Sequence, residues 1–149
     1  MSETPALQVV RGLLERGGLS PALDFLNRRV RHRFTAVYRL ESGVMRNVAI
    51  VDKQRDVIPD HLKAVPFETS FCQFVLRDGF FRYHGLRDDR LEGHPYKGVV
   101  ESYVGLPLAD GDAQLVGTFC HFDFPPLPVS DEEFEFMQQV AKVLPDYLP

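Results

Sequence analysis

The chain has 149 residues, of which 44% are hydrophobic and 26% charged, which is the size and composition of one domain with a full core. Its net charge of −4 argues against nucleic-acid binding, which needs clustered excess lysine and arginine. The sequence has no apolar run of about 18 or more residues and no basic segment followed by an apolar core at its N-terminus. It therefore predicts neither a membrane span nor a signal peptide, and we expect a cytoplasmic protein.

Two local features refine this picture. Four arginines within residues 28–33 lie at the end of a predicted helix, where positive charge is favoured by the helix dipole. We interpret them as a solvated helix end rather than a nucleic-acid patch. The two cysteines, Cys72 and Cys120, are too few for a disulfide scaffold, and their spacing fits no zinc motif.

Two amphipathic helices are predicted at the start of the chain. The first spans residues 4–16 and ends at Gly17-Gly18. The second has Ser20 as its expected N-cap and Pro21 at its first position. Their apolar residues recur at helical spacing: Leu7, Val10 and Leu14 in the first helix, and Leu23, Leu26 and Val30 in the second.

A β-hairpin is predicted next. Residues 34–40 and 44–51 are rich in apolar and β-branched side chains, and Glu41-Ser42-Gly43 between them supplies a turn. The middle of the chain is less regular. We expect a short helix within residues 68–76, with Thr69 or Ser70 as N-cap and an end at Asp78-Gly79.

After this helix we predict a short strand over residues 80–84 and a long charged loop over 85–100, with a helical turn near 96–100. A second hairpin follows. Residues 102–108 and 116–123 have strand length and apolar content, and Asp110-Gly111-Asp112 is typical of a tight hairpin turn.

A closing helix follows the prolines after the second hairpin. Residues 130–133 form a capping box, in which Ser130 accepts from the third helical amide and Glu133 reaches back. One face of this helix is apolar: Phe134, Met137, Val140, Ala141 and Leu144. Helices at both ends of an antiparallel, hairpin-built sheet predict an α+β domain.

Four segments, in the right order, resemble the motifs of GAF domains, which are small-molecule sensing modules. Residues 69–72 resemble the family's S-x-C helix start, and residues 88–95 resemble its D-x-R…P loop. Residues 102–108 and 117–123 resemble its two central strands. The resemblance extends over residues 20–144, so we expect a single GAF domain over 1–149 with an N-terminal helix over 1–18.

This resemblance implies a PAS-like antiparallel sheet. The terminal helices are expected on one face, and a ligand cavity between the other face and the middle helices and loops. Members of the family bind cyclic nucleotides, tetrapyrroles, haem, metabolites or ions, and some have lost their ligand. The resemblance thus predicts sensing more firmly than it predicts what is sensed.

Strand alternation divides the last strand into two faces. One face holds Val116, Thr118, Cys120 and Phe122, and the other holds Phe119, His121 and Asp123. In family members, ligand contacts come from the positions of Cys120 and Phe122, so we expect the Thr118 face to line the cavity. With the neighbouring segments, the expected ligand-binding residues are Phe71, Cys72, Tyr83, Arg90, Tyr96, Tyr103, Thr118, Cys120 and Phe122.

Several of these residues also have simpler explanations. Cys72 and Cys120 are favoured as small buried hydrophobes rather than a redox pair. His121 is expected to pack or to make one hydrogen bond, not to bind metal or haem. Arg90 fits equally an anion-binding group and a local ion pair that ties down the loop.

Enzymatic activity is not expected. The free methionine sulfoxide reductases of this family use a cysteine in the middle loop and carboxylates on the cavity strands. Here the loop over 85–100 has no cysteine, Tyr103 replaces a glutamate, and Cys120 and Phe122 occupy the two acidic positions. Neither a bilin-attachment motif nor the cyclic-nucleotide signature is recognisable, so the sequence identifies no cofactor and no metal.

Three hypotheses follow. The first is a sensor whose ligand orders the 85–100 loop and shifts the terminal helices. The second is a redox switch in which Cys72 and Cys120 pair across the cavity. The third is a homodimeric assembly module joined through the apolar faces of the first and last helices. Because the chain ends soon after its closing helix, we expect no attached output domain and action through a partner protein.

Overall fold

A computed structural model describes residues 4–57, 60–67, 70–85, 91, 93–94 and 99–149. Its strands are β1 (Phe34–Glu41), β2 (Val44–Asp52), β3 (Ala64–Pro66), β4 (Phe81–Tyr83), β5 (Ser102–Ala109) and β6 (Leu115–Asp123). Its helices are α1 (Pro5–Gly17), α2 (Leu19–Arg28), α3 (Asp60–Lys63), α4 (Cys72–Asp78), α5 (Asp131–Ala141) and the 3-10 helix η3 (Leu144–Tyr147). None of the described helices is long and apolar enough to cross a membrane.

The strands form one antiparallel sheet in the order β3-β2-β1-β6-β5-β4. Both predicted hairpins are confirmed, since β1 pairs with β2 and β5 with β6. Strands β1 and β6, which are far apart in sequence, pair at the centre and join the two hairpins into one sheet. The α+β fold is thereby confirmed.

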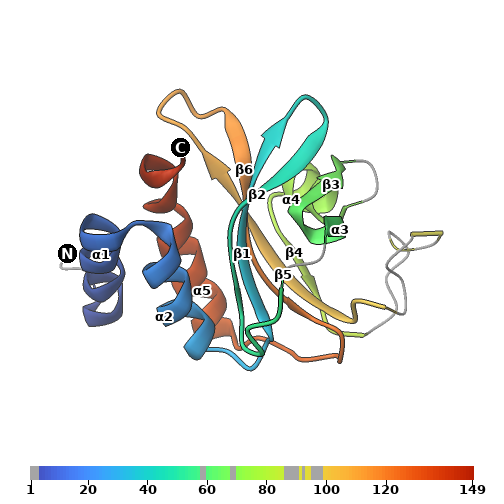
Figure 1. Cartoon of the computed structure of the whole chain (residues 1–149), viewed down its shortest axis with the longest axis horizontal. Coiled ribbons are helices and arrows are strands. Elements are labelled where there is room, and N and C mark those ends of the chain that lie inside the picture. The colour runs from blue at the N-terminus through green and yellow to red at the C-terminus, as the bar shows by residue number, and fades with distance from the viewer. Residues whose placement is uncertain (1–3, 58–59, 68–69, 86–90, 92, 95–98) are drawn as a thin grey trace.

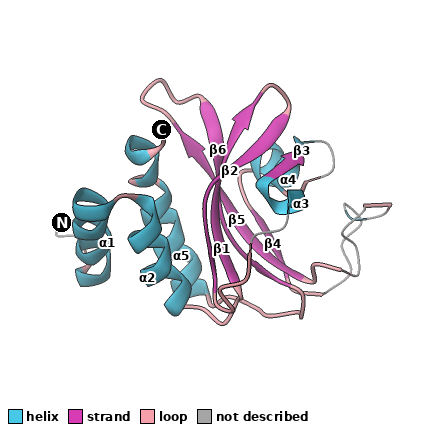
Figure 2. Ribbon diagram, viewed as in Figure 1, coloured by secondary structure: helices cyan, strands magenta, loops and turns pink. Residues whose placement is uncertain are grey.

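The sheet separates two layers, as Figures 1 and 2 show. Helices α2 and α5 cover one face, with α1 packed on their outer side, and the short helices α3 and α4 lie on the other face. Each face has its own hydrophobic core. The core under the terminal helices includes Leu23, Leu26, Val37, Phe119, Met137 and Val140, and the core under α4 includes Ala36, Phe71, Phe74, Val75, Phe81 and Cys120.

Two predicted helix starts are wrong by one or two residues. Helix α2 begins at Leu19 after Gly18, whose φ of 78° only glycine adopts readily, so Ser20 lies in the first turn. Helix α4 has Phe71 at its N-cap position with no side-chain cap, because the Ser70 hydroxyl donates instead to the Phe67 carbonyl at 2.9 Å. The alternative N-cap, Thr69, lies outside the described residues.

The capping box of α5 forms only in part. The Ser130 hydroxyl accepts from the Glu133 amide at 3.1 Å, as predicted. The Glu133 carboxylate does not reach back, because it forms two hydrogen bonds of 2.9 Å with Arg29 at the end of α2. On the apolar face of α5, Phe136 is buried, whereas Phe134 is partly buried beneath the guanidinium of Arg82.

The alternation predicted for β6 breaks at its first residues. The pairing of β5 with β6 shifts register between Leu108, opposite Gly117, and Ala109, opposite Leu115, so Val116 is the extra residue of a bulge. Val116 therefore packs against the core under the terminal helices, and its assignment to the Thr118 face is wrong. From Thr118 onward the predicted alternation holds, with Phe119 and Cys120 in opposite cores.

Candidate functional site

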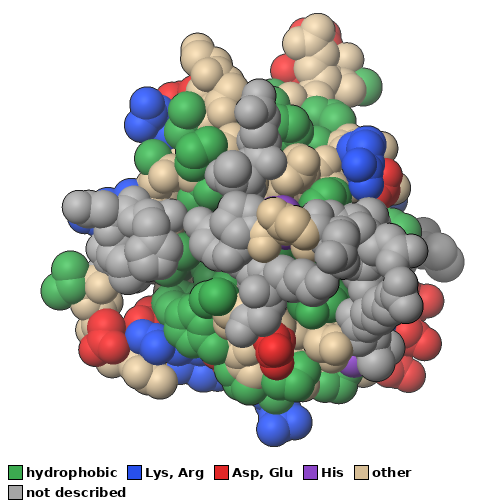
Figure 3. All heavy atoms as spheres, turned by 90° about the vertical axis from the view of Figure 1, so that its right-hand side faces the viewer, with side chains coloured by type: hydrophobic (Ala, Val, Ile, Leu, Met, Phe, Trp, Pro, Cys, Tyr) green, Lys and Arg blue, Asp and Glu red, His purple; other side chains and the backbone are tan. Residues whose placement is uncertain are grey.

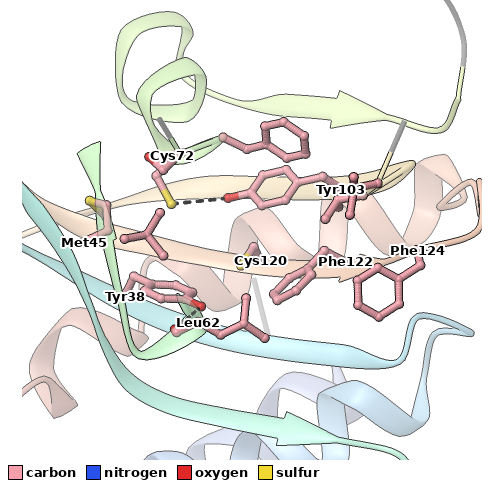
Figure 4. A pocket seen from close by; sticks show the side chains of 13 residues that line it. Tyr38, Met45, Leu62, Cys72, Tyr103, Cys120, Phe122 and Phe124 are labelled. Atoms are coloured by element: carbon pink, nitrogen blue, oxygen red, sulfur yellow. Dashed lines mark hydrogen bonds between the residues drawn. The ribbon is translucent and has the colours of Figure 1, made fainter. Parts of the chain in front are cut away.

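A cavity of about 80 Å³ lies between the sheet and helix α4, on the face opposite the terminal helices (Figure 4). Strands β1, β5 and β6 contribute Tyr38, Tyr103, Cys120 and Phe122, and the start of α4 contributes Phe71 and Cys72. Val99 and Phe124, which are 52% and 42% exposed, line it at the surface. Figure 3 shows several separate patches of hydrophobic side chains on this face, interspersed with charged ones.

The structure brings five of the nine predicted residues together around this cavity. These are Phe71, Cys72, Tyr103, Cys120 and Phe122. Thr118 is fully buried beside the cavity without lining it, and its hydroxyl lies 3.2 Å from Cys72 Sγ. Tyr83 does not line this cavity but a separate small hollow next to His32. Arg90 and Tyr96 lie outside the described residues.

Sequence analysis missed eight lining residues: Tyr38, Met45, Leu62, Val65, Ser70, Val99, Val100 and Phe124. Tyr38 could have been found, because alternation along β1 places it with Phe34 and Ala36 on the cavity face. Its hydroxyl donates to the Leu62 carbonyl at 2.7 Å and so ties α3 to the sheet. Met45 and Val65 come from β2 and β3, whose pairing only the folded sheet reveals.

Tyr103 is held in place by the glycine two residues further along β5. A Cβ added to Gly105 would lie 2.7 Å from Tyr103 Cε1 and 2.8 Å from its hydroxyl oxygen, so the ring lies across a position where no side chain fits. Phe71 packs edge-on against the ring at 5.2 Å between centroids. The Tyr103 hydroxyl thereby lies 3.6 Å from Cys72 Sγ (Figure 4).

Burial keeps Cys72, Cys120 and Tyr103 neutral at pH 7. Burial raises the pKa of the Cys72 thiol, although hydrogen bonds to Thr118 and Tyr103 oppose this. Burial, and then the neighbouring Cys72, raise the pKa of Cys120 well above its usual range. Burial likewise raises the pKa of Tyr103. The site is therefore a largely apolar pocket in which the Tyr103 phenol and both thiols are neutral.

We expect both thiols to be unreactive in the folded protein, because the thiolate is the reactive form and burial disfavours it. With a disulfide reagent at pH 7.5, Cys72 and Cys120 should react at least about a hundredfold more slowly than in the denatured chain, at a rate set by opening of the fold. The variants Cys72→Ser and Cys120→Ser show which thiol is responsible for each phase of the reaction with the reagent. Rapid reaction of either native thiol would favour the redox-switch hypothesis instead.

His121 lies on the other face of β6, in the core under the terminal helices. It is fully buried, and its Nδ1 lies 2.6 Å from the Thr35 hydroxyl, which agrees with the prediction that it packs and makes one hydrogen bond. Among the described residues, no group of three or more histidine, cysteine or acidic side chains is arranged to hold a metal ion.

Comparison with known proteins identifies the fold. No family model matches the sequence, and no curated protein matches it. The structure is similar to that of a GAF domain from an Acinetobacter phosphoenolpyruvate-protein phosphotransferase, with a TM-score of 0.71 and 11% identity over 98% of this chain and 94% of the other.

Two further solved structures show the range of proteins with this fold. One is the phycoerythrobilin-bound GAF domain of a cyanobacterial phytochrome, with a TM-score of 0.69, 15% identity and coverage of 98% and 95%. The other is the free methionine-R-sulfoxide reductase of Neisseria meningitidis in complex with its substrate, with a TM-score of 0.71, 14% identity and coverage of 99% and 92%. At these identities the similarity is one of fold.

Proposed function

We propose that this chain, which has the fold of a GAF domain, is a sensory domain that binds a small molecule in the cavity between its sheet and α4. One observation supports this proposal above the others: the cavity gathers Phe71, Cys72, Tyr103, Cys120 and Phe122 from three separate elements around an apolar space. Apolar pockets with few polar groups are typical of small-molecule sites.

The sheet offers a physical route from the ligand to the terminal helices. Along β6, Cys120 and Phe122 face the cavity, whereas Phe119 lies in the core with α2 and α5. A ligand that displaces β6 therefore also displaces the surface on which these helices pack, because closely packed cores transmit strain. We expect the signal to pass through α1, α2 and α5 to a partner protein.

The proposed function does not include catalysis. Similar folds occur in free methionine-R-sulfoxide reductases, and that reaction needs a nucleophilic thiolate. Both thiols of this chain are buried, and burial raises the pKa of each. We expect no reduction of free methionine sulfoxide with dithiothreitol as reductant. Turnover that disappears in Cys72→Ser or Cys120→Ser would contradict this.

A ligand carried through purification is the most direct test of the proposal. The untagged protein should show, by native mass spectrometry or absorbance, an added mass or chromophore that the variant Cys120→Ile loses. Isoleucine at this fully buried position fills the cavity and suits a strand. Val104→Ile, which adds volume in the opposite core, is the control and should keep the ligand. Retention by Cys120→Ile would exclude this cavity as the site.

Homodimerisation is a separate prediction that sedimentation velocity at micromolar concentration tests. The expected interface needs revision, because Leu7, Val10 and Leu14 of α1 are buried in the core of their own chain. The apolar faces of α1 and α5 are thus occupied within one molecule, and a dimer would have to use other surfaces.

A further inference from the structure

The Tyr103 hydroxyl is a strong hydrogen-bond donor whose partners in the cavity are two thiols, those of Cys72 and Cys120. The side chain is 5% exposed, and its oxygen lies 3.6 Å from Cys72 Sγ. Thiol sulfur is a weak partner, whereas buried tyrosine hydroxyls usually bond to oxygen or nitrogen. Tyr38 illustrates the usual case, since its hydroxyl donates to the Leu62 carbonyl at 2.7 Å. An acceptor brought by a ligand would therefore improve the bonding of Tyr103.

The same hydroxyl is fixed in position. The ring lies across Gly105, where a Cβ would approach it to 2.7 Å, and it packs against Phe71 on one side and Phe122 on another. Little side-chain entropy remains to be lost when this donor meets an acceptor. The cavity thus contains a preorganised hydrogen-bond donor within a largely apolar lining.

The size of the cavity limits what enters it. A cavity of about 150 Å³ holds a benzene ring, and this one has a volume of about 80 Å³. It therefore accepts a group of roughly three or four non-hydrogen atoms. Val99 and Phe124 line the cavity where it meets solvent, and both are large, apolar and partly exposed. They suit an apolar remainder of the ligand that stays at the mouth.

We infer that the ligand carries a small, neutral carbonyl group, such as an acetyl or a carboxamide, that enters the cavity and accepts a hydrogen bond from Tyr103. A flat apolar remainder then lies against Phe124 and Val99 at the mouth. A neutral group fits because an ionised one would lose its hydration in surroundings formed by Phe122, Cys120 and Tyr38. This inference rests on the proposed function, since it assigns a ligand class to the same cavity.

Three probes of similar shape test the inference: acetophenone, α-methylstyrene and benzoate. The first two differ only in a carbonyl oxygen against a methylene group, and benzoate adds a charge. In NMR titrations we expect acetophenone to bind about threefold to tenfold more tightly than α-methylstyrene, and benzoate to bind most weakly. Tyr103→Phe should abolish the preference for acetophenone without weakening α-methylstyrene. Tyr83→Phe, on the neighbouring strand outside the cavity, should leave all three affinities unchanged.

The outcomes separate the two proposals. Binding of none of the three probes overturns the sensory proposal together with this inference. Equal binding of acetophenone and α-methylstyrene, unchanged by Tyr103→Phe, or tighter binding of benzoate, overturns the assigned ligand class and leaves the cavity as a binding site. If Tyr103→Phe does not fold, infrared spectra of the wild-type complex decide, because a carbonyl bonded to Tyr103 absorbs at a lower frequency than in an apolar solvent.

Discussion

Replacing Gly117 by alanine should destabilise the domain by at least about 3 kcal/mol, at the upper end of what overpacking costs. A Cβ at this position would lie 2.0 Å from the backbone oxygen of Tyr38, on the paired strand β1. Backbone cannot turn away as a side chain can, so the central β1–β6 pairing must open. Urea unfolding followed by circular dichroism measures the loss.

Gly111→Ala is the matched control for this prediction. Gly111 lies in the turn between β5 and β6, and a Cβ there would meet no atom within 4 Å. We expect its unfolding midpoint to stay close to that of the wild type. If Gly117→Ala were as stable as Gly111→Ala, the close approach of β1 to β6 described here would be wrong.

Lowering the pH from 7.5 to 5.5 should also destabilise the domain strongly, because two buried histidines are held neutral. The Asn27 side-chain amide donates to the Thr35 hydroxyl at 2.8 Å, and this hydroxyl lies 2.6 Å from His121 Nδ1. Burial, followed by the charges of His32 and Lys53, lowers the pKa of His121 well below 6.5. Burial also lowers the pKa of His32, although its bond to the Leu127 carbonyl and the nearby Asp123 oppose this.

The sign of the effect follows from linkage. Below about pH 6.5 these histidines bind protons in the unfolded chain but remain neutral in the folded chain. The free energy of unfolding therefore falls as the pH is lowered. Above that pH the histidines are neutral in both states, and the stability that their lowered pKa values contribute is fully present. Each histidine adds a slope of up to about 1.4 kcal/mol per pH unit. Urea unfolding at several pH values measures this slope.

The variant His121→Asn tests whether the loss of stability at low pH comes from protonation of His121 or from a general effect of acid. Asparagine keeps a side-chain hydrogen-bond partner for the Thr35 hydroxyl but does not titrate. It should be less stable than the wild type at pH 7.5 and lose less stability on acidification. His84→Asn, which replaces an exposed histidine, should retain the wild-type slope. Stability that does not change between pH 7.5 and 5.5 would contradict the buried, neutral state of His121.

Local sequence patterns predicted most of the elements correctly. The hairpins over 34–52 and 102–123 and the helices at both ends follow from residue spacing, turns and caps, which depend on neighbouring residues. The prediction that Cys120 and Phe122 share a face, opposite Phe119, also held, because alternation is a property of any regular strand.

Where local patterns competed with packing, the predictions were less accurate. The Val116 assignment was wrong because a bulge depends on the partner strand β5. The Glu133 carboxylate does not complete the capping box, because it bonds instead to Arg29, which is remote in sequence but adjacent in the fold. Thr118 lies on the predicted face, but Cys72 of α4 covers it.

The sequence by itself determined the α+β architecture, its GAF-like order of elements and the division of β6 into two faces, because these depend on periodicity and on short motifs. Only the tertiary structure decided which residues surround the cavity, how large it is, and that the Tyr103 hydroxyl contacts sulfur within it. Those properties arise where β1, β5, β6 and α4 meet, and contacts between segments so distant in sequence leave no local pattern to detect.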